Sequence, residues 1–506
     1  MKLMKKIILL ILTVILVALP ILSCADNDDV SGPTPTGEND PTIGSETNGN
    51  IDENENEADA QETLGTDLPA DLDFGGYDFR IFFRSGRDSN DHQVRGIMYT
   101  EEAVGEAMND ATIRRNTYLA ERYNFNIVGI PSYTDGRGRA EAGTVNRSVM
   151  AGDDEFDAVM LRMSEAASLM TSGSIHDLAD IPYFNFDRPW WNTSLIEQAS
   201  VGSRKYMVTG DIIATGPNAL RVFFFSKGLI ADFELDCPYE MVRNGTWTLD
   251  NFYHMIQDVS ADLDGDGIMG INDRFGFLVQ GGASIAMFYS AGQHVITRDE
   301  DNLPMPLPPD TLTVNVLQRI FEILRSPDMV MFDQDFGGHV ALMNTFADNR
   351  GLFFAEILHL AERMRAEEIY FGILPPPKAD IHQEHHMVWA DGWCLNMLVV
   401  PITNRDMTRT GQILELMAFE SMTTTRPAFY DIALVSQFAR DEESSEMLDI
   451  IIANQVISLC EGLGWGMHGA ISGELSNRRG NFASAIEVFS RIQERNIDNF
   501  ISALFD

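Results

Sequence analysis

Positively charged residues are scarce in this chain. Its 506 residues include 36 Lys and Arg against 76 Asp and Glu, so the formal net charge is −40. A negative potential of this size repels the phosphates of nucleic acids and of anionic lipid surfaces. We therefore expect no nucleic acid partner and no charge-driven binding to an anionic lipid surface.

Cysteine is also rare. Of the 4 cysteines, Cys24 lies near the N-terminus, and Cys237, Cys394 and Cys460 are far apart with no CxxC pair. At most one disulfide is possible among these last three, and isolated buried thiols are the alternative. The spacing does not decide between the two.

The sequence lacks the short motifs of common catalytic sites. It contains no GxSxG, no HExxH and no P-loop, and no segment repeats at a fixed period. We therefore expect a protein that is not an enzyme. A secreted glycan-active enzyme is a minor alternative, because a glycoside hydrolase needs only two carboxylates on either side of a bond.

The N-terminus has the pattern of a secretory leader. Three lysines among the first six residues precede an apolar run at 7–22, which ends in ILSC at 21–24. This run is short for a membrane span, and ILSC resembles a bacterial lipobox. We predict a lipoprotein signal peptide at 1–23 and lipidation, with palmitate among the acyl chains, at Cys24. An ordinary signal peptide and an uncleaved anchor are the alternatives.

Residues 24–70 are of low complexity. Asn, Asp, Glu, Gly, Pro and Thr dominate, and 25–67 contain no Lys or Arg. A segment with few apolar groups and one sign of charge forms no core and repels itself into an extended tether. We expect an acidic, disordered tether that holds a folded body away from a membrane.

Apolar stretches and amphipathic stretches alternate along the rest of the chain, which predicts an α/β body. A cap at Thr248 begins one predicted helix, and Asn109 or Asp110 caps another helix that leads into a strand by residue 130. The other predicted strands are 77–83, 156–161, 205–212, 221–230, 370–378 and 393–401, and the other helices include 314–327, 357–368, 412–424 and 443–460.

The stretch DLDGDGIMGIND at 262–273 has the spacing of a twelve-residue calcium loop. Such a loop supplies oxygens from positions 1, 3, 5, 7 and 12 and has Gly at position 6. Position 12 is usually Glu, and Asp is one methylene shorter. Since no second loop is found, we expect a structural Ca²⁺ and not a sensor; a turn with solvated acids is the alternative. The expected ligands are Asp262, Asp264, Asp266, the Ile268 carbonyl and Asp273, with Gly267 at the turn.

A series of segments along 74–506 resembles the extracellular solute-binding proteins of ABC importers, in the carbohydrate-type family 1 found as lipoproteins in Firmicutes. No single segment is specific, but their order behind a lipobox and an acidic tether is. The segments are FGGYDFRIFFRS, AGDDEFDAVML, PWWN, KYMVTGDI, FFFSKGLI, GTWTLDNFYHMI, the calcium loop, GLFFAEI, YFGILPPPK and RPAFYDIAL.

The resemblance implies an α/β fold with two interleaved lobes and a hinge, as in type II periplasmic binding proteins. The body would cover 71–506, with lobe 1 at about 74–220 and 385–435 and lobe 2 at about 225–380 and 436–506. A loop similar to the calcium loop recurs in some relatives as a structural site. These boundaries and the ion are expectations from the resemblance.

The same resemblance implies capture of a small solute, a carbohydrate or oligosaccharide, in a cleft between the lobes. The partners would be that sugar and an ABC permease in the membrane, and the protein would be a monomer, lipid-anchored on the extracellular face of the cell membrane. A receptor for peptides or amino acids is the main alternative, and an adhesion lipoprotein is a further one.

Sugars bind to aromatic faces and to fixed polar groups, so Trp and acidic residues near strand ends are the candidates for ligand contacts. We expect the alternation in VWADGWC to put Trp389, Asp391 and Trp393 on one face. We expect Glu356 to start a helix, where a favourable charge on the helix dipole is its alternative role. For the other candidates a core Trp or a turn-capping acid is the alternative, and we interpret Arg426 and Tyr430 as structural. The stretch HQEHH, with His382, Glu384, His385 and His386, is a solvated loop or, less well supported, a zinc site. The candidate ligand-binding residues are Trp190, Trp191, Asp211, Glu356, Trp389, Asp391 and Trp393.

Overall fold

The computed structural model of the chain describes residues 65–86, 107–134, 140–307, 310–430 and 442–505. The expected signal peptide at 1–23, the lipidation site Cys24 and most of the expected tether lie outside the described residues. Strands and helices alternate through the described part, which confirms the predicted α/β body.

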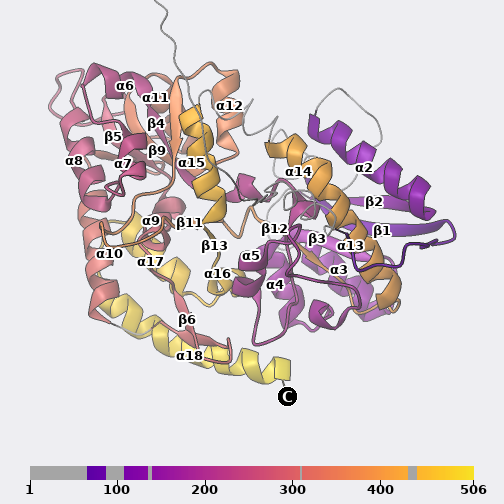
Figure 1. Cartoon of the computed structure of the whole chain (residues 1–506). Helices are drawn as coiled ribbons and strands as arrows, with labels where there is room; N and C mark the ends of the chain where they lie inside the picture. Colours follow the sequence, from indigo (N-terminus) through magenta and orange to yellow (C-terminus); the bar gives the residue numbers. More distant parts are fainter. Residues whose placement is uncertain (1–64, 87–106, 135–139, 308–309, 431–441, 506) are drawn as a thin grey trace, which may run out of the picture. The chain divides into compact units, whose positions relative to one another are not determined.

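A four-stranded sheet has the order β12-β3-β1-β2 (Figure 1). β1 (Tyr77–Gly86) is parallel to β2 (Phe125–Thr134) and to β3 (Ala158–Arg162), and β12 (Asn396–Val399) is antiparallel to β3. The strand predicted at 77–83 is thus β1, an inner strand of this sheet. Four helices pack against the sheet or against one another, namely α2 (Ala107–Tyr123), α3 (Ala140–Ala151), α4 (Met163–Thr171) and α13 (Met407–Thr423).

A five-stranded sheet has the order β10-β4-β9-β5-β8. β5 (Phe275–Val279) is parallel to β8 (Val330–Phe332) and β9 (Gly351–Ile357), while β4 (Arg221–Ser226) is antiparallel to β9 and to β10 (Phe371–Leu374). Helices in contact with this sheet are α6 (Lys227–Asp232), α7 (Pro238–Arg243), α8 (Leu249–Val259), α11 (His339–Ala347) and α15 (Glu442–Ala453).

Aromatic side chains fill the core of the second sheet. Phe223 stacks on Phe277 with 5.2 Å between ring centroids, and Phe252 meets Phe277 edge-on at 5.0 Å. Such pairs add to the free energy of burying their large apolar surface. The predicted cap of α8 is confirmed, because the Thr248 hydroxyl accepts a hydrogen bond from the Asn251 backbone N–H.

Four local predictions are wrong. The helix predicted at 443–460 ends at Ala453, and Gln455–Val456 form a short strand. The stretch 205–212 forms no ladder strand in the structure; it makes isolated bridges and ends in a 3-10 turn. The strand predicted at 221–230 stops at Ser226, because the Ser226 hydroxyl caps α6 and so favours a helix there. Asn109 and Asp110 lie inside α2 and do not cap it.

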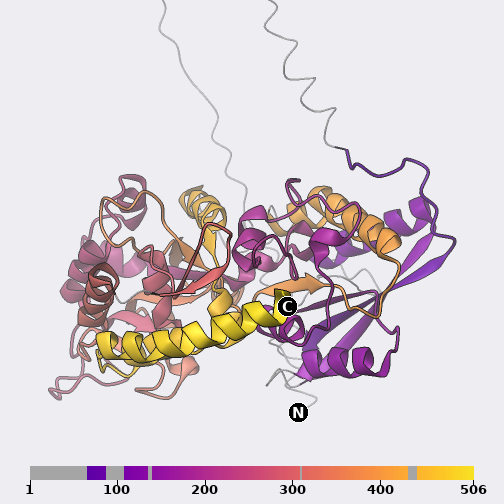
Figure 2. The same cartoon turned by 90° about the horizontal axis from the view of Figure 1, so that it is seen from below.

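Two small sheets and the C-terminal helices complete the described part. β11 (Val388–Trp389) pairs with β13 (Gln455–Val456), and β6 (Ile296–Arg298) pairs with β7 (Pro304–Pro306). The long helix α18 (Phe482–Phe505), yellow in Figure 2, contacts β7, α4, α10 and α17. None of the described helices has both the length and the apolar character of a membrane span.

The remaining helical segments are short connections, apart from α10 and α17. They are η3 (Leu178–Asp180), α5 (Thr193–Ala199), η4 (Asp211–Ile213), η5 (Gly216–Ala219), η6 (Gly281–Ile285), α9 (Ala286–Ser290), α10 (Thr311–Leu324), α12 (Leu360–Ala366), α14 (Thr425–Pro427), α16 (Leu459–Leu463) and α17 (Met467–Ser476).

Candidate functional site

Polar side chains gather at the carboxyl ends of strands in both sheets. In the first sheet β3 ends at Arg162. The segment 208–210 has an antiparallel bridge to β12, which is itself antiparallel to β3, so this segment runs parallel to β3. Asp211 therefore follows at the same edge of the sheet as Arg162. In the second sheet Glu356 lies near the carboxyl end of β9, and the antiparallel strand β4 begins beside it at Arg221. Ligands of open α/β sheets bind outside the carboxyl ends of the strands.

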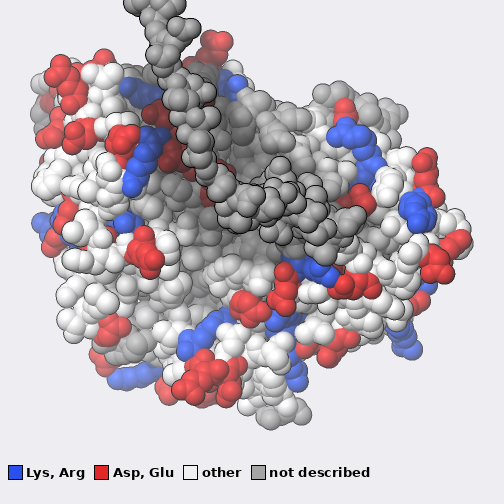
Figure 3. Space-filling model, in the orientation of Figure 1, with Lys and Arg blue, Asp and Glu red and all other residues white. Residues whose placement is uncertain are grey.

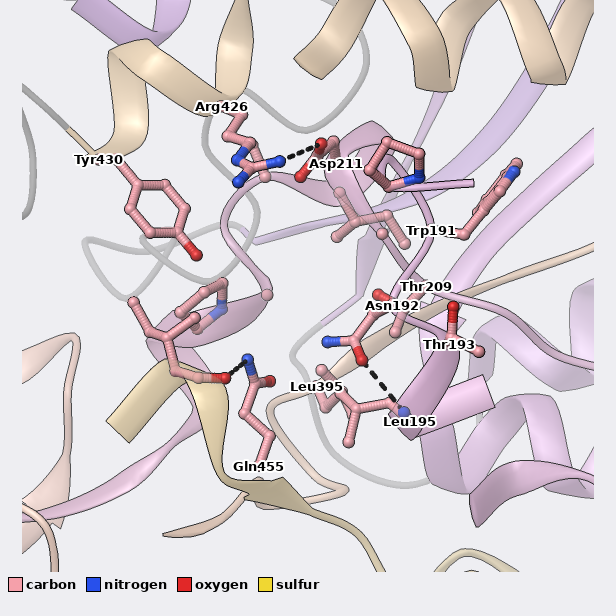
Figure 4. A pocket seen from close by; sticks show the side chains of 17 residues that line it. Trp191, Asn192, Thr193, Leu195, Thr209, Asp211, Leu395, Arg426, Tyr430 and Gln455 are labelled. Atoms are coloured by element: carbon pink, nitrogen blue, oxygen red, sulfur yellow. Dashed lines mark hydrogen bonds and ion pairs between the residues drawn. The ribbon is translucent and has the colours of Figure 1, made fainter. Parts of the chain in front are cut away.

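A cavity of about 260 Å³ lies at this edge of the first sheet (Figure 4). Its walls come from the three segments that link the two sheets. The first link, between β3 and β4, contributes residues of 209–217, and the second, between β10 and β12, contributes Leu395. The third link follows α13 and contributes Arg426 and Tyr430. Gln455 of β13 closes another side. A ligand in this cavity would therefore contact every link between the sheets.

The cavity presents both acceptors and donors of hydrogen bonds. The carboxylate of Asp211 pairs with the Arg426 guanidinium at 3.3 Å, and Figure 4 shows the Tyr430 hydroxyl turned toward the cavity. Burial raises the pKa of Asp211 to about 6, and the Arg426 charge offsets part of that rise. A neighbouring acceptor and donor of this kind suit a hydroxyl group, which both donates and accepts. The interpretation of Arg426 and Tyr430 as purely structural gains no support from this placement.

A buried charged network joins the second link to the second sheet. Arg221 donates from Nη2 to Asp391 Oδ2 at 2.5 Å and from Nη1 to Glu356 Oε1 at 2.7 Å. The other oxygen of Glu356 lies 3.2 Å from His339 Nδ1. Burial alone would lower the pKa of Arg221, but the charges of Asp391 and Glu356 outweigh it and raise that pKa. We name Arg221, Glu356, Asp391 and His339 the crossover network.

The crossover network brings together two of the predicted ligand residues, Glu356 and Asp391, through an arginine that the sequence reasoning missed. A lone Arg at the start of the apolar run RVFFFS was a usable signal, because a buried Arg requires acidic partners. Glu356 does not start a helix as expected; it lies within β9. Burial by itself would raise the pKa of Glu356, but the charge of Arg221 and the hydrogen bond and charge of His339 together lower it.

The prediction that Trp389, Asp391 and Trp393 share one face is wrong. β11 ends at Trp389, and Asp391 then caps a turn by accepting a hydrogen bond from the Trp393 N–H at 2.9 Å. Trp389 is buried and donates its indole N–H to Glu461, whereas Trp393 is 51% exposed. All six tryptophans are described, and the other five are at most 6% exposed, so Trp393 is the one indole open to a ligand face.

Trp190 and Trp191 lie in the core of the first sheet. Each donates its indole N–H to one oxygen of Glu415, both at 2.9 Å. Burial raises the pKa of Glu415 to about 7, although the two indoles lower it. Trp191 borders the cavity, but its indole points away from it (Figure 4). The structure therefore places both indoles where they hold α13 rather than a solute.

The acidic loop between α8 and β5 folds with its carboxylates together. Oxygens of Asp262, Asp264 and Asp273 lie within 4.8 Å of one another. Gly267 has φ +83°, which suits the sharp turn of a calcium loop. Asp266 is outside this close group, and its carboxylate accepts from the Ile268 N–H at 2.8 Å. Three convergent carboxylates are the oxygen donors that Ca²⁺ prefers, so most of the expected ligand set fits the ion.

The HQEHH stretch makes no metal site in the part of the chain that the structure describes, where the acidic loop is the sole group of convergent ligands. His386 is buried with its Nδ1 3.1 Å from the Pro376 carbonyl, while His385 and Glu384 are exposed. None of the three described cysteines, Cys237, Cys394 and Cys460, is in a disulfide.

No protein-family model matches the sequence, and no curated protein is similar to it at a significant level. The structure, however, is similar to solved structures at low sequence identity. The maltose- and maltodextrin-binding domain from Bdellovibrio bacteriovorus, bound to maltotriose, has a TM-score of 0.51 and 10% identity, over 83% of this chain and 100% of that one. An ABC substrate-binding protein from Listeria monocytogenes in complex with cycloalternan has 0.51 and 10%, over 84% and 99%.

A third similar structure is UspC of M. tuberculosis, with a TM-score of 0.54 and 11% identity, over 82% of this chain and 100% of that one. Nearly the whole length of each neighbour is thus matched. The chain has the two-lobed α/β fold of type II periplasmic binding proteins, as the resemblance of its segments implies.

Proposed function

We propose that the chain is the solute-binding lipoprotein of an ABC importer, which captures a carbohydrate or oligosaccharide and delivers it to a membrane permease. The observation that carries this proposal is the cavity whose walls come from all three links between the sheets. A ligand bound there favours the placement of the lobes in which it contacts them best, which is how binding drives hinge closure.

Within the proposal, each polar group of the site has a role in holding sugar hydroxyls. Asp211 accepts a hydrogen bond from one hydroxyl, and Arg426 donates to a neighbouring one. Trp393 does not line this cavity, and its exposed indole would offer an aromatic face to a further ring of an oligosaccharide. The crossover network holds Asp391, and with it the turn that carries Trp393, in place.

The ligands of similar proteins support a sugar over a peptide or amino acid. Two of the three neighbours described above are bound to maltotriose and to cycloalternan, and both are described as binding proteins rather than enzymes. The lipobox at 21–24 and the acidic stretch behind it support lipid anchoring at Cys24 outside the cell membrane. A monomer anchored in this way reaches its permease by diffusion in the membrane plane.

Replacing Asp211 by Asn should weaken sugar binding by about 10- to 100-fold, because a hydrogen bond to a charged group contributes about 1.5–3 kcal/mol. A thermal-shift screen of mono- and oligosaccharides, amino acids and short peptides first identifies the ligand, since a ligand of the folded state raises the melting midpoint. Titration of the variant then measures its affinity.

Asp187→Asn is the matched control, because Asp187 is exposed and outside the cavity. It should leave the affinity unchanged. If only amino acids or peptides raised the melting midpoint, the ligand would be an amino acid or a peptide and not a sugar. The absence of any shift in a protein that melts cooperatively would count against a transport receptor and favour adhesion.

We further propose that the acidic loop holds a structural Ca²⁺. Asp262, Asp264 and Asp273 would supply carboxylate oxygens, joined by the Ile268 carbonyl and by Asp266 after a local adjustment. When bound, the ion would neutralise the repulsion among these carboxylates and clip the end of α8 to the start of β5.

Adding 10 mM CaCl₂ should raise the free energy of unfolding by about 1.4–2.7 kcal/mol, which follows from a Kd of about 10⁻⁴–10⁻³ M for extracellular calcium sites. Denaturant melts with and without chelator measure this. Asp264→Asn should abolish most of the gain, and MgCl₂ should give much less because Mg²⁺ demands a tighter octahedral site. Equal stabilisation by the two ions would disprove a calcium site.

A further inference from the structure

A second cavity, of about 540 Å³, is lined by β13 and the residues next to it. Helix α5 and strand β6 form two of its sides, and β13 with the residues after it forms a third. Gln455 lines both cavities, so the two share a wall. The proposed function makes no use of this second cavity.

No Asp or Glu is among the described residues that line the second cavity. This is unusual in a chain with 76 acids and 36 bases, whose acidic side chains are spread over the face shown in Figure 3. Much of the wall is aliphatic, with Val295, Ile296, Met387, Ile457 and Leu459. The ionisable side chains in the lining are Arg298 and two histidines, His294 and His385.

Arg298, beside this cavity, forms no ion pair with a carboxylate in the part of the chain that the structure describes. Its guanidinium donates to the carbonyls of Gln198, Ser200 and Asn302 and to the Asn302 side-chain oxygen, all of which are neutral. Burial lowers its pKa, and Glu197 partly offsets this, but the Glu197 carboxylate is paired with Lys205 at 2.9 Å. A partly buried cation without a carboxylate costs free energy that an anionic ligand would recover.

His294 adds a second group suited to an anion. In the described part of the chain it has no hydrogen-bond or ion-pair partner, although it is only partly exposed. Burial and then the charge of Arg298 lower its pKa, and both side chains line the same cavity. As a neutral ring it still donates one hydrogen bond, so an acceptor between it and Arg298 would be bound from two sides.

We propose that the second cavity binds a monocarboxylate with an apolar body, such as a short aliphatic acid. Arg298 and His294 would hold the carboxylate, and the aliphatic wall would cover the body. A compact, strongly hydrated anion such as phosphate fits less well, because it would leave that wall without a partner. The proposal does not depend on the ligand of the first cavity.

Binding in the second cavity would act on the first through their shared wall. Gln198 of α5 donates to the Gln455 carbonyl at 3.3 Å and accepts from the Ile457 N–H at 2.9 Å, which fixes β13 at the wall that the two cavities share. A carboxylate that shifts this segment would change the affinity for the solute, and the solute would change the affinity for the carboxylate by the same factor.

The test is calorimetric titration of the purified protein with hexanoate, hexanol and acetate. Hexanoate should bind about 10- to 100-fold more tightly than hexanol, because the uncharged alcohol cannot form an ion pair with Arg298. It should also bind more tightly than acetate, which lacks the apolar body. Equal affinities for hexanoate and hexanol would overturn the proposal, as would no binding of hexanoate.

Met387→Glu places a negative charge in the cavity and leaves Arg298 in the sequence. It should weaken hexanoate binding at least about tenfold. The matched control is Met305→Glu in β7, because Met305 is 43% exposed and outside the cavity. Arg298→Met should have the same effect as Met387→Glu. If Arg298→Met does not fold, the Met387→Glu variant alone tests the proposal. Asp211→Asn, measured without a solute, should leave hexanoate binding intact. If this variant no longer bound hexanoate, the hexanoate site would be the first cavity, and the proposal would be overturned.

Discussion

Replacing Arg221 by Met is expected to lower the free energy of unfolding by about 3–5 kcal/mol, which is the usual cost of removing one partner from a buried ion network. Arg221, Glu356 and Asp391 have side chains that are 9%, 5% and 7% exposed. Methionine fills much of the same space, so the loss measures the two carboxylates that remain buried without their counter-ion. Denaturant melts followed by tryptophan fluorescence would measure it.

The matched control is Arg491→Met on α18. Arg491 pairs with Glu487 at 2.7 Å, but the two side chains are 77% and 65% exposed, so the expected loss is below about 0.5 kcal/mol. Adding Glu356→Gln and Asp391→Asn to Arg221→Met removes the stranded charges and should recover part of the stability. If Arg221→Met lowered the free energy of unfolding by less than about 1 kcal/mol, water would enter the crossover network, and the network would not hold the second link.

Replacing Gly411 by Ala is expected to destabilise the protein by at least about 2 kcal/mol, although alanine is a better helix former than glycine by about 1 kcal/mol. Gly411 is buried in α13, and a Cβ there would lie 2.0 Å from the Pro182 carbonyl oxygen and 3.0 Å from Ile181 Cγ2. The first of these is a backbone atom, so α13 or the segment after η3 must move. Thermal or denaturant melts would show the loss.

Gly469→Ala is the control for the same change in a helix with room. Gly469 is exposed in α17, and a Cβ there meets nothing within 4 Å. The intrinsic helix propensity should then act alone and stabilise the protein by about 0.5–1 kcal/mol. The two glycines should therefore respond with opposite signs. Stabilisation by both substitutions would mean that α13 does not pack as closely on Pro182 as the structure has it.

The α/β class and the convergence of carboxylates in the acidic loop could be read from the sequence because both are encoded in short-range patterns. A run such as YDFRIFF predicts a strand from neighbouring residues alone, and Asp262, Asp264 and Asp273 are brought together by a single turn of chain. The Thr248 cap is of the same kind. In each case the residues that interact lie within about a dozen positions, where spacing and direction are tightly linked.

The tryptophans show the limit of such reasoning. Trp190, Trp191 and Trp393 look alike as aromatic residues beside polar ones, yet two are buried on Glu415 and one is half exposed. Glu415 lies 224 positions after Trp191, so no local pattern connects them. Whether an indole faces a core or a ligand depends on which distant side chain meets its N–H.

The sequence by itself determined the alternation of strands and helices, the acidic tether as an expectation, and the donors of the acidic loop, since local sterics and periodicity act over a few residues. The assembly of the site required the tertiary structure. Arg221 reaches Glu356 across 135 positions and Asp391 across 170, and Arg426 meets Asp211 across 215. Ion pairs of this range form because the sheets bring their carboxyl ends together, and that arrangement depends on the packing of the whole core.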